Sequence, residues 1–313
     1  MKIQMSKIKK VSLLGLAYEL GELRDIRSLN ELSNNNTVLE ALLKLDLKTY
    51  SKSMFSASEM AYNSIQSTIE KSSLPKSEID ALLYVSDQSL GLDSRQEVSR
   101  VMDKLELTNA YPIGISLSAS GNLHTAIRIA TSLLRTDEYR NILIATVSKL
   151  EDYSSRIVPP NVSVQSDAAA SCIVSSTVEG TFDIIKTVQH ANASINNIDP
   201  LIQSTEYFDS IAEGIQLTVE KLMGNIGKVS KDFSKFIMNN YNSSVAQTIC
   251  AISGFSQEQT FTENIHRFAH AVASDNIINL CDMLDKDYIQ KCDLILLLGT
   301  GPSTWGATAL LKV

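Results

Sequence analysis

The sequence predicts an α/β protein made of two similar halves, and three observations point to this. The chain is 313 residues long, enough for two domains of ordinary size. Short apolar runs alternate with longer segments whose apolar residues recur at helical spacing. The alternation in the first half recurs in the second. We therefore expect parallel-rich sheets covered by helices, with the halves meeting near residue 180.

Strands are expected where an apolar run of strand length is bounded by polar turns. Eight such runs occur, at 11–17, 81–86, 112–116, 141–146, 169–176, 182–188, 294–299 and 307–313. Helices are expected between them, at 56–71, 94–107, 123–134, 210–226, 243–252 and 271–284. The first of these opens with Ser56 followed by Glu59, which is typical of a helix start. The Asn/Ser-rich segment 33–37 is expected to be an exposed turn.

Composition excludes several classes of protein. The chain has 28 Lys and Arg against 35 Asp and Glu, a net charge of −7 that disfavours nucleic-acid binding. No apolar run reaches the length of a membrane span. The basic N-terminal stretch lacks a cleavage site, so we expect a cytoplasmic protein. The four cysteines form no C-x-x-C pair, and we expect buried, reduced thiols rather than a zinc site or disulfides.

The usual signatures of nucleotide, metal and hydrolase sites are also missing. The sequence has no P-loop, no G-x-G-x-x-G, no H-E-x-x-H and no G-x-S-x-G. We therefore expect neither a metal nor a bound cofactor. The strongest candidate for chemistry is the small-residue turn Leu117-Ser118-Ala119-Ser120-Gly121, between a predicted strand and a predicted helix. Such a turn exposes its central side chain and directs backbone N–H groups toward a bound group.

This turn, I-S-L-S-A-S-G, is similar to the nucleophile turn D-I-S-A-A-C-S-G of the β-ketoacyl-acyl-carrier-protein synthase III family of the thiolase superfamily. Segments 58–83, 135–145, 166–170 and 299–307 resemble further family motifs in the same order. The resemblance implies a thiolase-like fold, in which two similar halves form a five-layered α-β-α-β-α sandwich. It divides the chain into halves at 1–180 and 181–313.

The resemblance also locates the catalytic positions of the family. Aligned without gaps at this turn, its cysteine falls on Ala119. Its H-Q-A-N and R-Y-G-N motifs place its histidine on Asn239 and its asparagine on His270. The family's oxyanion hole would be formed by the N–H groups of Ala119 and Gly301. Since a methyl group cannot hold an acyl group as a thioester, the usual covalent step is lost at Ala119.

Three side chains remain as candidates for chemistry. The hydroxyls of Ser118 and Ser120 flank the empty position, where they could accept an acyl group or serve as helix caps. The imidazole of His270 could act as a general base or could be structural.

Two functional interpretations follow from the resemblance. The first is a non-catalytic subunit of an acyl-condensing or acyl-transferring enzyme in fatty-acyl or polyketide-type metabolism, paired with a second synthase-III-like chain as a homo- or heterodimer. The second is an acyltransferase or decarboxylating condensing enzyme that works without a covalent acyl-enzyme, through His270, Asn239 and the backbone oxyanion hole. An acyl carrier protein or acyl thioester is the expected partner in either case.

Overall fold

The computed structural model describes residues 9–87, 90, 92–159 and 162–313. Most of the basic N-terminal stretch therefore lies outside the described residues. The described part contains no helix that is long and apolar enough to cross a membrane.

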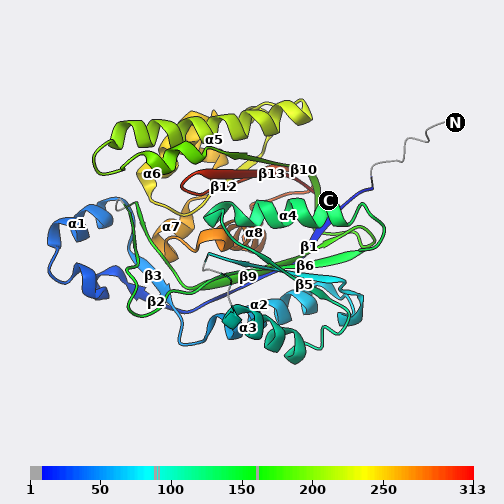
Figure 1. Cartoon of the computed structure of the whole chain (residues 1–313). Coiled ribbons are helices and arrows are strands. Elements are labelled where there is room, and N and C mark those ends of the chain that lie inside the picture. The colour runs from blue at the N-terminus through cyan, green and yellow to red at the C-terminus, as the bar shows by residue number, and fades with distance from the viewer. Residues whose placement is uncertain (1–8, 88–89, 91, 160–161) are drawn as a thin grey trace.

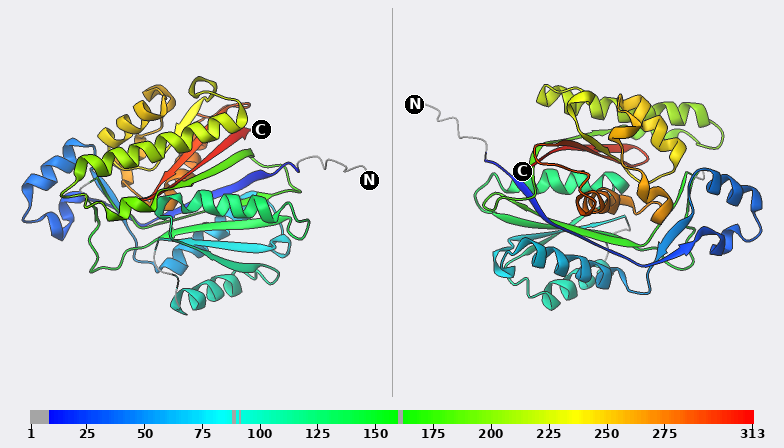
Figure 2. Two further views of the ribbon diagram at one scale, coloured as in Figure 1. Left: turned by 45° about the horizontal axis from the view of Figure 1, so that its top comes forward. Right: turned by 180° about the vertical axis from the view of Figure 1, so that it is seen from behind.

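The predicted five-layered sandwich is confirmed, with two β-layers that each lie between helices (Figure 1). Helices α2 and α3 cover one outer face, α5 and α6 cover the other, and α4 and α8 lie between the β-layers. The bounds of these helices are α2 Ala57–Ser72, α3 Leu92–Lys104, α4 Asn122–Leu133, α5 Ser204–Ile226, α6 Ser243–Ser253 and α8 Asp275–Asp285. Figure 2 shows the long helix α5 along the outer face from two further directions.

The two halves share one strand order, which explains the repeat in the sequence. The first half runs β1 (Ser12–Leu20), β9 (Ala168–Ser175), β6 (Asn141–Ser148), β4 (Ala81–Ser86), β5 (Tyr111–Ile115). The second runs β10 (Phe182–Ala191), β13 (Thr304–Lys312), β12 (Leu294–Thr300), β11 (Lys235–Ile237). In each half, the strand that comes first in the sequence lies beside the last strand of that half. The penultimate and the second strands then follow in that order across the sheet. Pairing of Ser12 with Asp183 and of Leu13 with Phe182 joins the halves.

The expectation of parallel-rich sheets is correct only for part of the structure. Strands β4, β5 and β6 are parallel, as are β11 and β12, because helices cross between them. The remaining pairs are antiparallel. Strands β12 and β13, for example, are joined by the short turn 301–303, which reverses the chain direction. The sheet is therefore mixed.

Several short elements are absent from the predicted set. They are β2 (Glu22–Asp25), β3 (Thr49–Lys52), β7 (Ile157–Val158), β8 (Ser163–Val164), α1 (Asn36–Lys44), α7 (Glu263–Phe268) and the 3-10 helices η1 (Ile26–Ser28), η2 (Asn30–Leu32), η3 (Lys76–Glu78), η4 (Ala119–Gly121), η5 (Ala193–Asn197), η6 (Ser230–Asp232), η7 (Gln257–Gln259) and η8 (Val272–Ser274). The exposed turn expected at 33–37 is wrong in part. Asn35 instead caps α1, accepting a hydrogen bond from the N–H of Val38.

Helix α8 is buried along nearly its whole length between the two β-layers. Its side chains Ile277, Ile278 and Leu280 belong to one core cluster with α4 and strands of both halves. A helix that is buried on all sides has little freedom to shift. This matters for function because the first residue of α8, Asp275, belongs to the site described below.

The cysteines are mostly as expected. Cys172, Cys250 and Cys281 are buried and unpaired. Burial raises the pKa of all three thiols, which disfavours reactive thiolates. The expectation fails for Cys292, which is exposed on the turn before β12.

Two glycines of α5 give a matched test of how tightly this helix packs on β13. A Cβ on Gly214 would lie 2.4 Å from the Trp305 ring, whereas a Cβ on Gly224 would have no neighbour within 4 Å. We expect Gly214→Ala to lower the free energy of unfolding by about 1–3 kcal/mol through overpacking. Gly224→Ala should raise it by up to about 1 kcal/mol through helix propensity. Chemical denaturation measures both; equal effects would contradict this packing.

Candidate active site

The turn after β5 presents two small residues to a cavity. Ala119 has a φ of +44°, a conformation that non-glycine residues seldom adopt, and it begins η4, which leads into α4. Ala119 and Ser120 both line the cavity. Ser118 instead lines a smaller hollow beside His190 and Trp305, and it makes no side-chain cap. The two serines proposed from the sequence therefore point to different places.

The Ser120 hydroxyl, the His270 imidazole and the Asp275 carboxylate form a buried chain of polar contacts. The Oγ of Ser120 lies 3.1 Å from Nε2 of His270. The other ring nitrogen of His270, Nδ1, lies 2.6 Å from Oδ2 of Asp275. All three residues are buried. A carboxylate at Nδ1 favours the tautomer with its proton there, which leaves Nε2 free to accept the serine proton.

The Asp275 carboxylate is held by four further hydrogen bonds. Oδ1 accepts from the N–H of Ala271 at 2.7 Å and from the Asn240 amide at 3.1 Å. Oδ2 accepts from the N–H of Asn240 at 2.9 Å and from the Asn239 amide at 3.3 Å. Hydrogen bonds to the charged form stabilise a buried carboxylate. Asp275 is therefore fixed as the group that orients His270.

Asn239 has its polar atoms engaged within the protein. Its amide nitrogen donates to the carbonyl of Val272 at 2.9 Å as well as to Asp275. Its Oδ1 accepts from the N–H of Thr300 at 3.0 Å. The residue does not line the cavity. Asn239 thus positions Asp275 and the β12–β13 turn.

His270 is held in place by its backbone and by a ring contact. Its N–H donates to the Val164 carbonyl at 3.0 Å, and its own carbonyl accepts from Ser166 at 2.8 Å. The Tyr241 ring lies 4.5 Å from the imidazole, centroid to centroid. Burial raises the pKa of Tyr241 to about 12, against hydrogen bonds with Thr300 and Ser120 that lower it. Tyr241 is therefore a neutral neighbour of the reacting groups.

The backbone N–H groups near Ser120 differ in whether they are free to donate a hydrogen bond to a bound oxyanion. The N–H groups of Ala119 and Ser120 begin a helix, where the first donors have no intrahelical acceptor. The Gly301 N–H, proposed from the sequence as an oxyanion donor, donates to the Thr304 carbonyl at 2.7 Å. In this conformation it is occupied. The turn of Ala119 and Ser120 offers the better oxyanion site.

The cavity next to Ser120 has a volume of about 560 Å³, within the range of small-molecule sites. Most of its wall is apolar, and helices α5 and α6 contribute many of the lining residues, among them Ile211, Ile249 and Ile252. Its polar lining residues include Ser120, His270 and Asp87. This arrangement suits an apolar chain that ends in a reactive carbonyl.

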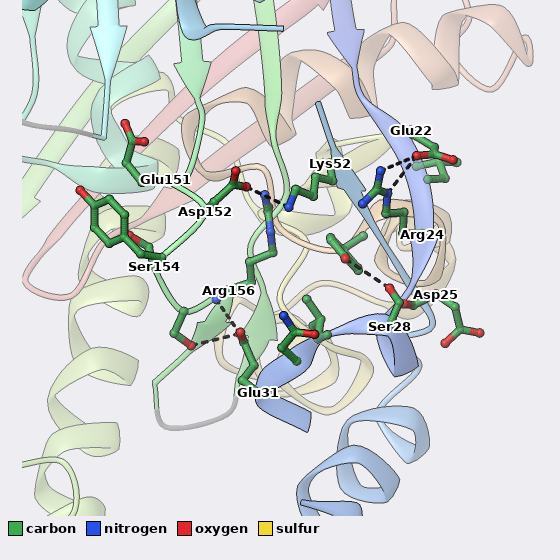
Figure 3. Close-up of a pocket in the computed structure, with 16 residues that line it drawn as sticks. Glu22, Arg24, Asp25, Ser28, Glu31, Lys52, Glu151, Asp152, Ser154 and Arg156 are labelled. Atoms are coloured by element: carbon green, nitrogen blue, oxygen red, sulfur yellow. Dashed lines mark hydrogen bonds and ion pairs between the residues drawn. The ribbon is translucent and has the colours of Figure 1, made fainter. Parts of the chain in front are cut away.

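A second hollow of about 1050 Å³ lies over the β2–β3 pair (Figure 3). Its charged side chains are already paired: Arg24 with Glu22 at 2.7 Å and Lys52 with Asp152 at 2.9 Å. Arg156 is turned to the buried Asp167, with 3.0 Å to each carboxylate oxygen. Because these cations are neutralised, the hollow does not offer a strong anion site.

Asp275, Tyr241 and Asp87 are site residues that the sequence did not reveal. The spacing of five between His270 and Asp275 was one available signal, since it places a carboxylate at the start of an apolar helix. Tyr241 stands where the family motif H-Q-A-N has alanine, which could have marked it as a change in the site. No signal in the sequence singled out Asp87.

Comparisons with known proteins agree with the fold described above. A model of the 3-oxoacyl-[acyl-carrier-protein] synthase III C-terminal domain matches residues 223–312. The chain is related to that family. β-Ketoacyl-[acyl-carrier-protein] synthase III 2 of Vibrio cholerae is 23% identical over 229 residues, 67% of this chain and 63% of the relative. Synthase III of Natranaerobius thermophilus is 23% identical over 279 residues, 80% of this chain and 83% of its own.

Solved structures share the fold of this synthase-III-like chain. ChlB3, an acyltransferase, superposes with a TM-score of 0.86 at 15% identity, covering 97% of this chain and 98% of its own. A Xanthomonas campestris OleA variant with bound lauric acid and lauroyl-CoA gives a TM-score of 0.82 at 13% identity, covering 97% and 100%. At these identities the likeness shows the fold alone, and the chemistry has to be argued from this chain's own residues.

Proposed function

We propose that this synthase-III-like chain is an acyltransferase that carries the acyl group on Ser120. The observation that carries the proposal is the contact of Ser120 Oγ with His270 Nε2 at 3.1 Å, backed by the 2.6 Å contact of His270 with Asp275. Nucleophile, base and orienting carboxylate are the three parts that hydroxyl activation requires. The proposal differs from both interpretations drawn from the sequence, because it includes a covalent intermediate.

The first half-reaction forms the acyl-enzyme. Ser120 Oγ attacks the carbonyl carbon of an acyl thioester while His270 Nε2 takes the serine proton. Asp275 stabilises the resulting imidazolium. The carbon–sulfur bond then breaks, and the sulfur leaves as a thiol with the proton from His270. The N–H groups of Ala119 and Ser120 stabilise the oxyanion in between.

The second half-reaction transfers the acyl group. A hydroxyl or amine of the acceptor attacks the Ser120 ester, and its proton passes to His270 Nε2. The carbon–oxygen bond to Ser120 breaks, and the serine oxygen takes the proton back from His270. Hydrolysis of an oxygen ester at Ser120 releases less free energy than hydrolysis of a thioester. Transfer of the acyl group from this ester to another alcohol therefore has a free-energy change near zero. We therefore expect acyl transfer rather than carbon–carbon condensation.

The cavity supports a fatty-acyl or polyketide-type acyl group. Its apolar lining between α5 and α6 matches the chemistry of an alkyl chain. The family likeness supports a thioester donor, either free or on an acyl carrier protein. In OleA of Xanthomonas campestris, the related fold holds lauric acid and lauroyl-CoA.

Intact-mass analysis tests the proposal. After incubation with octanoyl-N-acetylcysteamine, we expect one octanoyl group per chain, and peptide mapping should place it on Ser120. Acyl groups spread over surface lysines would count against the proposal, as would the absence of any adduct in the presence of turnover.

A second candidate is the non-catalytic partner subunit expected from the sequence, and the exposed edge of β5 supports pairing with another chain. Tyr111 on this strand is 66% exposed, and Leu117, two residues beyond the end of the strand, is 97% exposed. Apolar side chains beside an unpaired strand edge favour a protein contact.

Oligomeric state tests this pairing. We expect the chain to form a dimer in light scattering, and Leu117→Asp to shift it toward monomer, because a buried charge opposes association. The exposed Leu201→Asp is the matched control and should leave the dimer intact. Stoichiometric co-purification with a second chain that carries Cys, His and Asn at the family positions would favour the non-catalytic role. A monomer at all concentrations contradicts the pairing.

A further inference from the structure

Asp87 is a cavity-lining carboxyl group that the acyl-transfer chemistry does not use. It follows β4, at the end of the strand nearest the Ser120 turn, and lines the same cavity as Ser120 and His270. Its Oδ2 accepts a hydrogen bond from the Gln165 amide at 2.7 Å. Its Oδ1 is buried and has no hydrogen-bond partner among the described residues.

An unpartnered buried carboxylate oxygen is costly, and Asp87 Oδ1 is the one such oxygen in the part of the chain that the structure describes. Burial raises the pKa of the Asp87 carboxyl, and hydrogen bonds from its own backbone and from Gln165 offset this only in part. A ligand that donates a hydrogen bond to Oδ1 would remove much of this cost.

The position of Gln165 indicates that Asp87 is held in place. The Gln165 amide donates to Ser148 Oγ at 3.0 Å as well as to Asp87. The Gln165 backbone forms a bridge with His270. Gln165 therefore connects the general base, His270, to the Asp87 carboxylate. Such a fixed pair can orient a bound molecule toward the acylated serine.

From this geometry we propose that Asp87 forms the subsite for the acyl acceptor, and that the acceptor is a small molecule with two donor groups. One hydroxyl or amine meets His270 Nε2 and attacks the Ser120 ester, while a second hydroxyl or ammonium group donates to Asp87 Oδ1. This inference rests on the proposed acyl transfer for the reacting group, but the binding of the second donor is independent of it. The acceptor oxygen or nitrogen forms a bond with the acyl carbon as the bond from that carbon to Ser120 Oγ breaks, and the acceptor's proton passes through His270 to the serine oxygen.

Three acceptors of equal heavy-atom count separate the possibilities. 1-Propanol has one donor, 1,2-ethanediol adds a second hydroxyl, and ethanolamine adds an ammonium group. Binding is measured first, without acyl donor, by saturation-transfer NMR on the full chain. We expect the diol or ethanolamine to bind more tightly than propanol by about tenfold or more, as expected for a hydrogen bond to a charged group. The preferred one of the two identifies the acceptor class.

Asp87→Asn is the diagnostic variant, with Asp93→Asn, on the exposed first turn of α3, as its matched control. We expect D87N to abolish the preference for the second donor in the binding measurement. D93N should leave this preference unchanged. Because D87N removes an uncompensated charge, it should not lower the melting temperature, whereas loss of a purely structural carboxylate would.

The outcomes keep the two proposals apart. Donor-dependent binding that D87N abolishes, without any acyl-Ser120, would support the subsite and overturn the proposed transfer. Acyl-Ser120 with equal affinity for all three acceptors, in wild type and D87N, would overturn the subsite alone. A uniform loss of stability, acylation and binding in D87N would assign Asp87 a structural role and also overturn the subsite. A transfer-to-hydrolysis ratio that falls at least tenfold in D87N for the diol or ethanolamine, but not for propanol, supports both.

Discussion

Ser120→Ala removes the acyl-enzyme and lowers the rate of acyl transfer by about 10⁶-fold, the scale seen when a serine nucleophile is lost. The physical reason is that the Ser120 hydroxyl lies 3.1 Å from the His270 base, whereas Ala119 carries only a methyl group. Intact mass after incubation with octanoyl-N-acetylcysteamine reports the adduct, and thiol release reports the rate.

Ser118→Ala is the matched control for this substitution. Ser118 lies two residues away but lines a different hollow, so we expect its variant to keep both the adduct and the rate. Ser120→Cys should retain an adduct, now as a thioester, because a thiol at this position reaches the same base. An adduct that persists in Ser120→Ala and disappears in Ser118→Ala would reverse the assignment.

Asp275→Asn is expected to lower the acylation rate by about 10³–10⁴-fold while leaving the fold in place. An amide at this position no longer fixes the proton on His270 Nδ1, and it cannot stabilise an imidazolium. The amide also faces the N–H donors of Asn240 and Ala271, which should lower the free energy of unfolding by about 1–3 kcal/mol. Burst kinetics give the rate, and chemical denaturation gives the stability.

Two comparisons make the Asp275 prediction specific. Asp285→Asn, at the exposed end of the same helix, should change neither quantity. The double variant Ser120→Ala/His270→Ala should be no slower than Ser120→Ala alone, because the groups act as one unit. Additive losses, or an Asp275→Asn variant that acylates at the wild-type rate, would rule out the proposed relay.

Much of the fold could be predicted from the sequence because its signals are local. Strand β4 was predicted with its observed bounds, since all six of its residues are buried and residues 81–85 form an uninterrupted apolar run that ends at the polar Ser86. Strands β2 and β3 were missed because they are short, mostly polar and depend on pairing with each other. The fold-level resemblance holds because the repeated apolar pattern survives at low sequence identity.

The site was only partly predictable for a different reason. Sequence alignment located Ala119, Asn239 and His270, but it could not say which side chain of the turn faces the histidine. In the structure the Ser120 hydroxyl contacts His270, whereas Asn239 does not line the cavity. The contact of Ser120 with His270 joins residues 150 positions apart. Only the packing of the two halves reveals it.

The burial of helix α8 has a consequence for how the activity can fail. Because Asp275 begins a helix enclosed by both β-layers, local fraying of the surface does not reach the groups that set the histidine proton. The acid–base machinery is therefore expected to persist until the whole molecule unfolds. Substitutions on outer elements would then reduce the amount of folded protein more than the activity of each remaining molecule.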